Sequence, residues 1–179
     1  MEKARELDRD NLWYAEYLAQ IYAEPGRLDQ SIETLEEIIE AKPDKVEYYF
    51  NLAALLGAQG KYEEAIKVYA ALEEKYGQME EVAMQRQVIY RDQKKPEKAL
   101  EEVDQLIEFN PSEIRYYGMK AEILEEMGRT EAAKLLYNKM LEMEPEYGQI
   151  YFSLFRIYEN EGKTTQARDY LLSAFESPG

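Results

Sequence analysis

The side chains that could carry out chemistry in this sequence are limited to carboxylates, lysines, tyrosines, serines and threonines. The chain has no cysteine and no histidine, which removes thiolate nucleophiles, the usual zinc ligands and the side chain that titrates near neutral pH. Paired carboxylates remain as candidates for acid–base catalysis, but Glu125 and Glu126 are adjacent on a predicted helix and so point apart. We therefore expect no catalytic residue, no cofactor and no metal site.

The chain is strongly acidic, with 37 acidic residues against 22 basic residues and a net charge of −15. Such a charge repels phosphate backbones, so we expect no nucleic-acid partner. No apolar run reaches the ~18–20 residues that a membrane-spanning helix needs, so we expect no membrane insertion by this segment. The absence of cysteine fits any compartment. A cytoplasmic location is favoured, with a periplasmic or lipid-anchored parent protein as alternatives.

The elements that must position these side chains repeat every 34 residues. Five copies follow one another without a linker, and they begin at Leu12, Val46, Glu80, Ile114 and Gly148. Within each copy, apolar residues recur at three- and four-residue steps on both sides of a turn, which predicts two helices per copy. The sequence therefore predicts an all-α chain of five helical hairpins over residues 12–179.

Two positions of the repeat explain where the helices end and how they pack. In four copies the turn holds a glycine, for which left-handed backbone at a helix C-terminus is easiest. These glycines are Gly26, Gly60, Gly128 and Gly162. The second helix carries a small side chain where it must approach the first helix closely. These small residues are Ser31, Ala65, Ala99, Ala133 and Ala167.

The third copy differs from the other copies at three positions. Arg86 and Gln87 are polar residues in its first helix, and Lys94 replaces the turn glycine. One interpretation is drift in a repeat that its neighbours hold in place, since stability in such arrays is shared across interfaces. The other is a flexible joint or an added contact surface. Lys94 stands at the glycine position of the turn, so we expect a strained left-handed backbone there.

The chain resembles the tetratricopeptide repeat family across residues 12–179, through segments such as LAALLGAQGKYEEAIKVY and AEILEEMGRTEAAKLLY. The resemblance implies an α-α superhelix, a right-handed solenoid of antiparallel helix pairs whose first helices line a concave groove. It also implies a scaffold that binds a protein or a peptide. Residues 1–11 are similar to the end of a repeat, with ELDRDN beside EAKPDK. This similarity predicts the tail of a preceding repeat or an N-terminal cap, in a fragment of a longer array.

Six positions of each first helix face the predicted groove, because they lie opposite the packing stripe of that helix. At least one of them is apolar in every copy: Trp13, Tyr17, Phe50, Met84, Val88, Met119 and Phe152. The polar candidates for ligand binding are Asn51, Arg115 and Arg156. The same face carries nine acidic residues against three arginines, which predicts binding of an apolar, partly basic segment. The alternative is that some of these side chains pack against the adjoining repeat.

Two other roles follow from the same residues. One subclass of the family holds carboxylate-ended peptides with a clamp of lysine, asparagine and arginine, but only Asn51 matches it, and Glu16 and Glu81 would repel a carboxylate. We therefore do not expect that role. The second is a structural spacer or self-association module in a larger protein. A homodimer through the C-terminal helix is predicted from four apolar residues with no following helix to cover them, Leu171, Leu172, Ala174 and Phe175.

Overall fold

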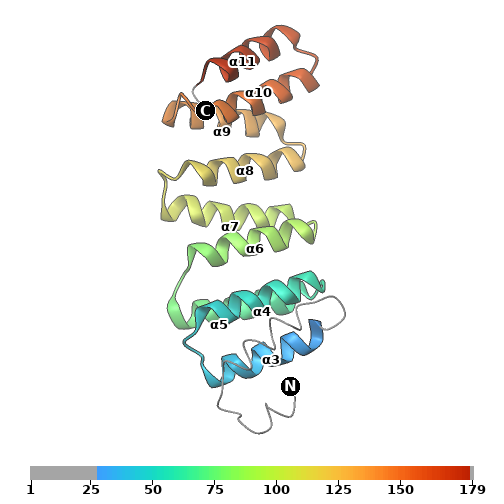
Figure 1. Ribbon diagram of the computed structural model, residues 1–179. Helices are drawn as coiled ribbons and strands as arrows, with labels where there is room; N and C mark the ends of the chain where they lie inside the picture. The colour runs from blue at the N-terminus through green and yellow to red at the C-terminus, as the bar shows by residue number, and fades with distance from the viewer. Residues whose placement is uncertain (1–27, 178–179) are drawn as a thin grey trace. The chain divides into compact units, whose positions relative to one another are not determined.

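The computed structural model describes residues 28–177, and these residues form nine α-helices and no strand (Figure 1). The helices are α3 (Leu28–Ala41), α4 (Val46–Ala58), α5 (Tyr62–Tyr76), α6 (Glu80–Asp92), α7 (Pro96–Phe109), α8 (Ile114–Glu126), α9 (Thr130–Met143), α10 (Gly148–Asn160) and α11 (Thr164–Glu176). The predicted all-α fold is confirmed. The predictions for residues 1–11 and for the first helix of the first repeat lie outside the described residues. No helix within residues 28–177 is both long enough and apolar enough to cross a membrane.

The chain divides into two compact units, one ending at Val82 and the other beginning at Ala83. In the first unit, α3 packs on α4, and α4 pairs with α5. In the second unit, α7 packs on α8, α8 pairs with α9, and α10 contacts both α9 and α11. Helices α4, α6, α8 and α10 begin 34 residues apart. The division of the whole chain into five repeats stays a prediction.

The same tight turn follows α4, α6, α8 and α10. After α4, the Gly60 N–H donates to the Gly57 carbonyl at 2.9 Å, and the Lys61 N–H donates to the Leu56 carbonyl at 2.8 Å. The second bond closes a Schellman motif, which requires one residue with left-handed backbone. The left-handed residues have φ values of 74° at Gly60, 71° at Gly128 and Gly162, and 58° at Lys94. The predicted left-handed backbone at Lys94 is therefore confirmed.

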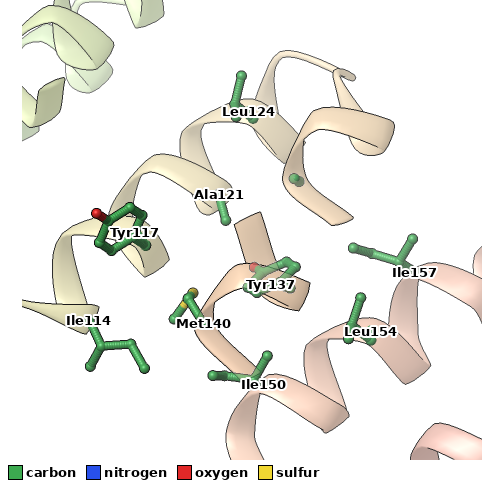
Figure 2. Packing of buried hydrophobic residues seen from close by; sticks show 10 residues of the cluster. Ile114, Tyr117, Ala121, Leu124, Tyr137, Met140, Ile150, Leu154 and Ile157 are labelled. Carbon is green, nitrogen blue, oxygen red and sulfur yellow. The ribbon is translucent and has the colours of Figure 1, made fainter. Parts of the chain in front are cut away.

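One core cluster of the second unit joins α8, α9 and α10 (Figure 2). In this cluster Tyr137 and Met140 of α9 are buried between the other two helices. Ile150, Leu154 and Ile157 of α10 meet them at i, i+4 and i+7 spacing, which places all three on one face of the helix. Helix α10 therefore covers the apolar side of α9 that faces away from α8.

A tyrosine hydroxyl ties three first helices to the loops that precede them. Tyr117 donates to the Pro111 carbonyl oxygen at 2.8 Å, and Tyr151 donates to the Pro145 carbonyl oxygen at 3.0 Å. In the first unit Tyr49 makes the same bond to Pro43 at 3.2 Å. We call this bond the tyrosine–proline clasp. The counterparts in the third repeat are Gly77 and Ala83, which offer neither the proline nor the hydroxyl.

The unusual residues of the third repeat have specific surroundings. The Arg86 guanidinium donates from Nε to Glu102 Oε2 at 3.0 Å, and its Nη2 lies 2.9 Å from the same oxygen. Both side chains are largely buried, so the ion pair replaces apolar packing between α6 and α7. The Gln87 side chain is also buried, and its carbonyl oxygen has no hydrogen-bond partner among the described residues. This repeat therefore has a more polar interior than its neighbours.

Replacing Lys94 with glycine should stabilise the protein. Left-handed backbone costs an L-residue about 1–2 kcal/mol, and the greater freedom of glycine in the unfolded chain offsets part of that gain. We expect Lys94→Gly to raise the unfolding free energy by about 0.5–1 kcal/mol and the melting temperature by about 2–4 °C. The reverse change Gly128→Lys, at a φ of 71°, should lower both. A lower melting temperature for Lys94→Gly would contradict the assignment of strain to this turn.

Candidate functional site

A hollow of about 190 Å³ opens between α8 and α10 in the second unit. We call it the α8–α10 hollow. Its apolar walls come from Met119 of α8, Met140 and the ring of Tyr137 from α9, and Ile150 of α10. Glu122 lies at its edge with an exposed carboxylate. Methionine side chains adapt to different shapes, so such walls suit an apolar side chain from another molecule.

The hollow exists because a side chain is missing from α8. Gly118 lines it, at the position that Phe50, Met84 and Phe152 occupy in the other described first helices. A Cβ added at Gly118 would lie 3.4 Å from the Met140 terminal methyl, which is the flexible end of that side chain. The absence of a side chain at Gly118 therefore leaves open space beside Tyr137 and Met140 of α9, although both side chains are themselves only 4% exposed.

A hydrogen-bonded group of three side chains lies beside the hollow. The Tyr137 hydroxyl donates to Glu125 Oε1 at 2.6 Å, and the Arg156 guanidinium donates to Glu125 Oε2 at 3.0 Å. Burial of the phenol raises the pKa of Tyr137, and the hydrogen bond to the Glu125 carboxylate raises this pKa further. The Tyr137 phenol is therefore a permanent hydrogen-bond donor at neutral pH, which holds the Glu125 carboxylate in one orientation.

A second, more polar hollow of about 210 Å³ lies in the same unit, and Val88, Arg91, Lys94 and Glu126 line it. Arg91 donates from Nε to Glu126 Oε2 at 3.2 Å, and its Nη1 lies 3.9 Å from Glu122 Oε2. These acceptors keep the pKa of Arg91 above its usual value, with the hydrogen bond to Glu126 as the largest cause. Glu125 and Glu126 thus bind different arginines, Arg156 and Arg91.

The second unit contains six of the predicted ligand-binding residues. Arg115 and Met119 both line the α8–α10 hollow, and Val88, 43% exposed, lines the second hollow. Met84 is half-buried against a core cluster of α6, α7 and α8. The other two, Phe152 and Arg156, lie on α10. Phe152 is 53% exposed and its ring centroid lies 5.6 Å from that of Phe155.

The remaining predicted residues belong to the N-terminal half of the chain. Asn51 is exposed on α4. Phe50 is half-buried, with its ring centroid 5.4 Å from that of Tyr69 on α5. Phe50 therefore packs on the second helix of its own pair. Trp13 and Tyr17 lie outside the described residues. That these side chains form one binding track stays a prediction.

The prediction from sequence did not include the residues that shape the α8–α10 hollow. Tyr137 and Met140 belong to a second helix, whereas the groove residues were predicted on first helices alone. Gly118 lies at a predicted groove position, but it was not chosen as a candidate because it has no side chain that could contact a ligand. The signal that could have revealed the hollow is this glycine among large apolar residues at the same repeat position. Within residues 28–177, no group of three or more acidic side chains is arranged to hold a metal ion.

Three family models described as tetratricopeptide repeat match the chain, over residues 16–80, 114–147 and 136–169. An uncharacterized protein of Sinorhizobium fredii, y4yS, is 36% identical over 74 residues, which are 41% of this chain and 41% of that protein. The human protein O-mannosyl-transferase TMTC1 is 23% identical over 163 residues, which are 89% of this chain and 18% of that protein. The chain therefore spans less than half the length of either curated relative.

Solved structures are similar over nearly the whole chain. MamA from Desulfovibrio magneticus has a TM-score of 0.68 and 14% sequence identity, and the match covers 93% of this chain and 94% of that chain. YrrB, described as a TPR protein with an unusual peptide-binding site, has a TM-score of 0.61 and 14% identity, over 98% and 90% of the two chains. At these identities the likeness shows the fold alone.

Replacing Tyr137 with phenylalanine tests the side-chain group beside the hollow. Phenylalanine keeps the buried ring but removes the donor to Glu125, so we expect the unfolding free energy to fall by about 1 kcal/mol. Urea unfolding followed by circular dichroism measures this change. Tyr147→Phe, at an exposed ring on the edge of the same hollow, is the matched control and should leave the midpoint unchanged. Equal midpoints for both variants would show that the hydroxyl of Tyr137 contributes nothing.

Proposed function

The chain belongs to the tetratricopeptide-repeat family, and on that premise we propose that its α8–α10 hollow binds an apolar side chain from a partly basic segment of a partner protein. The family fold serves generally as a scaffold for protein interactions and typically has no enzymatic activity. One relative is named a transferase, but the matching region is only 18% of that protein.

The observation that carries the proposal is the open space above Gly118. At about 190 Å³ the hollow is smaller than the ~300–1,000 Å³ of typical small-molecule sites, so it suits one side chain of a larger ligand. Phe50, Met84 and Phe152 occupy this position in the other described first helices. A ligand side chain in the hollow would take the place of the aromatic or methionine side chain that α8 lacks.

The carboxylate of Glu122 supports a basic flank on the ligand, and the cation that lines the same hollow, Arg115, is paired with Glu113 at 2.9 Å. Glu122 is exposed, and its nearest recorded cation is 3.9 Å away at Arg91. The two arginines facing α8 already have acidic partners, because Arg91 binds Glu126 and Arg156 binds Glu125. Glu122 is paired with Arg91 at that distance but keeps 59% of its side chain exposed, so it can also accept from a lysine or arginine next to the apolar anchor. The net charge of −15 would favour the encounter.

The alternative role, a spacer or self-association module, has its own supporting observation. On α11, Leu172 is 49% exposed and Phe175 is 82% exposed, and exposed apolar side chains that lie close together often mark a contact surface. Homodimerisation through this helix stays a prediction. Sedimentation of the intact chain over a range of concentrations separates it from a monomeric receptor.

The Gly118→Phe variant tests the hollow directly. Peptides are first selected on the wild-type chain from a displayed random library, and we expect an aliphatic residue beside lysine or arginine. Phenylalanine at position 118 should fill the hollow and weaken these peptides roughly thirtyfold, equivalent to about 2 kcal/mol for one buried aliphatic side chain. Isothermal titration calorimetry measures the affinities. Melting curves check the fold, which should be kept because the same position tolerates Phe50 and Phe152.

The control variant is Leu135→Glu, on a side chain of α9 that is 72% exposed and outside the hollow. It should leave the affinity unchanged. Selection of acidic peptides, or equal affinities for wild type and Gly118→Phe, would contradict the proposal.

A further inference from the structure

The second hollow lies beside the C-terminal ends of α6 and α8, and most of its lining is charged. The residues that line it are Val88, Arg91 and Asp92 of α6, Lys94 of the following turn and Glu126 of α8. Arg91 and Glu126 bind each other. Lys94 and Asp92 are exposed, and neither makes an ion pair with another residue in the part of the chain that the structure describes. One ammonium and one carboxylate are therefore available to a ligand.

The lysine of this hollow stands where the other repeats have no side chain. Of the turns that follow α4, α6, α8 and α10, only the turn after α6 has a side chain at its left-handed position, Lys94 at a φ of 58°. A Cβ added at Gly60, Gly128 or Gly162 would meet no atom within 4 Å, so a side chain would fit beside each of these turns. The obstacle is the left-handed backbone alone. Backbone strain of this kind often persists where the side chain has a function.

The two hollows lie along one face of α8. Gly118, Glu122 and Glu126 follow one another at four-residue steps, which places them on the same side of this helix. Glu122 lines the α8–α10 hollow, and its Oε2 lies 3.9 Å from the Nη1 of Arg91, which lines the second hollow. From Gly118 to Glu126 the helix rises by about 12 Å, at 1.5 Å per residue. An extended segment of about four residues covers that distance.

The charges of the second hollow favour a neutral ligand group that both donates and accepts hydrogen bonds. A carboxylate there would be repelled by Asp92 and Glu126, and a lysine or arginine would be repelled by the two cations of the lining. An apolar side chain would cover the Lys94 ammonium and the Asp92 carboxylate without giving either a partner. A side-chain amide avoids all three penalties, because its oxygen can accept from the ammonium and its NH₂ group can donate to the carboxylate.

From this lining we propose that the second hollow binds the side-chain amide of a glutamine or asparagine in the partner segment, about four residues from the apolar residue in the α8–α10 hollow. This inference rests on the proposed function, because one segment must reach both hollows. The basic residue that binds Glu122 lies between the two. Lys94 and Asp92 then determine specificity, since together they distinguish an amide from acidic, basic and apolar side chains.

The test begins with the peptides selected on the full wild-type chain. We expect them to carry a glutamine or asparagine about four residues from the aliphatic residue. Replacing this amide residue with leucine, glutamate or lysine should in each case weaken binding about tenfold, because hydrogen bonds to charged groups are lost. Isothermal titration calorimetry measures the affinities of the amide peptide and of its three replacements.

Variants of the chain separate binding from folding. Lys94→Gly should weaken the amide peptide about tenfold although it raises the melting temperature, whereas a lysine that served the fold alone would leave the affinity unchanged. Lys94→Met keeps the left-handed side chain but removes the charge, and it should weaken the peptide equally without the higher melting temperature. Asp92→Ala should also weaken the amide peptide. The matched control is Lys98→Met, which removes the same charge from an exposed position of α7 outside both hollows and should leave the affinity unchanged.

The two hollows can fail separately. If Gly118→Phe has no effect but Lys94→Gly weakens the amide peptide, the α8–α10 hollow is not the site of the apolar residue and the second hollow still binds the amide. If Gly118→Phe weakens the peptide but Lys94→Gly does not, the proposed function stands and this inference is overturned. It is also overturned if the selected peptides carry no glutamine or asparagine, or if leucine or glutamate in its place binds equally well.

Discussion

The close approach of the two helices depends, in each pair of which both helices are described, on one small side chain in the second helix. Ala65, Ala99 and Ala133 have no exposed surface, Ser31 is equally buried, and Ala167 is nearly so. A larger side chain there would hold the helices apart, because interiors are packed as densely as molecular crystals. The apolar stripes, the turn geometry and the position of the next pair all depend on that spacing.

The fold could be predicted from the sequence because it depends on residues that are close together in the chain. The site could not, because it depends on contacts between side chains of different helices. Helix pairs follow from apolar spacing, and the left-handed Lys94 follows from its place among turn glycines, since both depend on residues within one turn of helix. The α8–α10 hollow depends instead on Met140 of α9 and Ile150 of α10 meeting above Gly118. Periodicity assigns each residue to a face, and it does not show which side chains from other helices reach that face.

The charged residues of the first helices form ion pairs between neighbouring helices. From the sequence alone, the same arginines and glutamates predict only an acidic surface. In the second unit, Arg91 binds Glu126 and Arg156 binds Glu125 across neighbouring first helices. Exposed pairs of this kind add little stability, but wrong pairings bring like charges together. The charges therefore specify which helices can lie side by side, and they leave Glu122 exposed.

The tyrosine–proline clasp has a consequence for local opening. Where Tyr49, Tyr117 and Tyr151 each hold the loop six residues before them, the loop cannot detach without breaking a bond from a helix that is itself packed. Loop and helix should then exchange their amide hydrogens as one cooperative unit. Residues 77–79 have no such bond from Ala83, and the Gly77 and Met79 amides donate instead to the carbonyl oxygen and the carboxylate of Glu73 on α5. The amide exchange of this loop should therefore follow the opening of the end of α5, whereas the loops held by a tyrosine should exchange together with the helix that follows them.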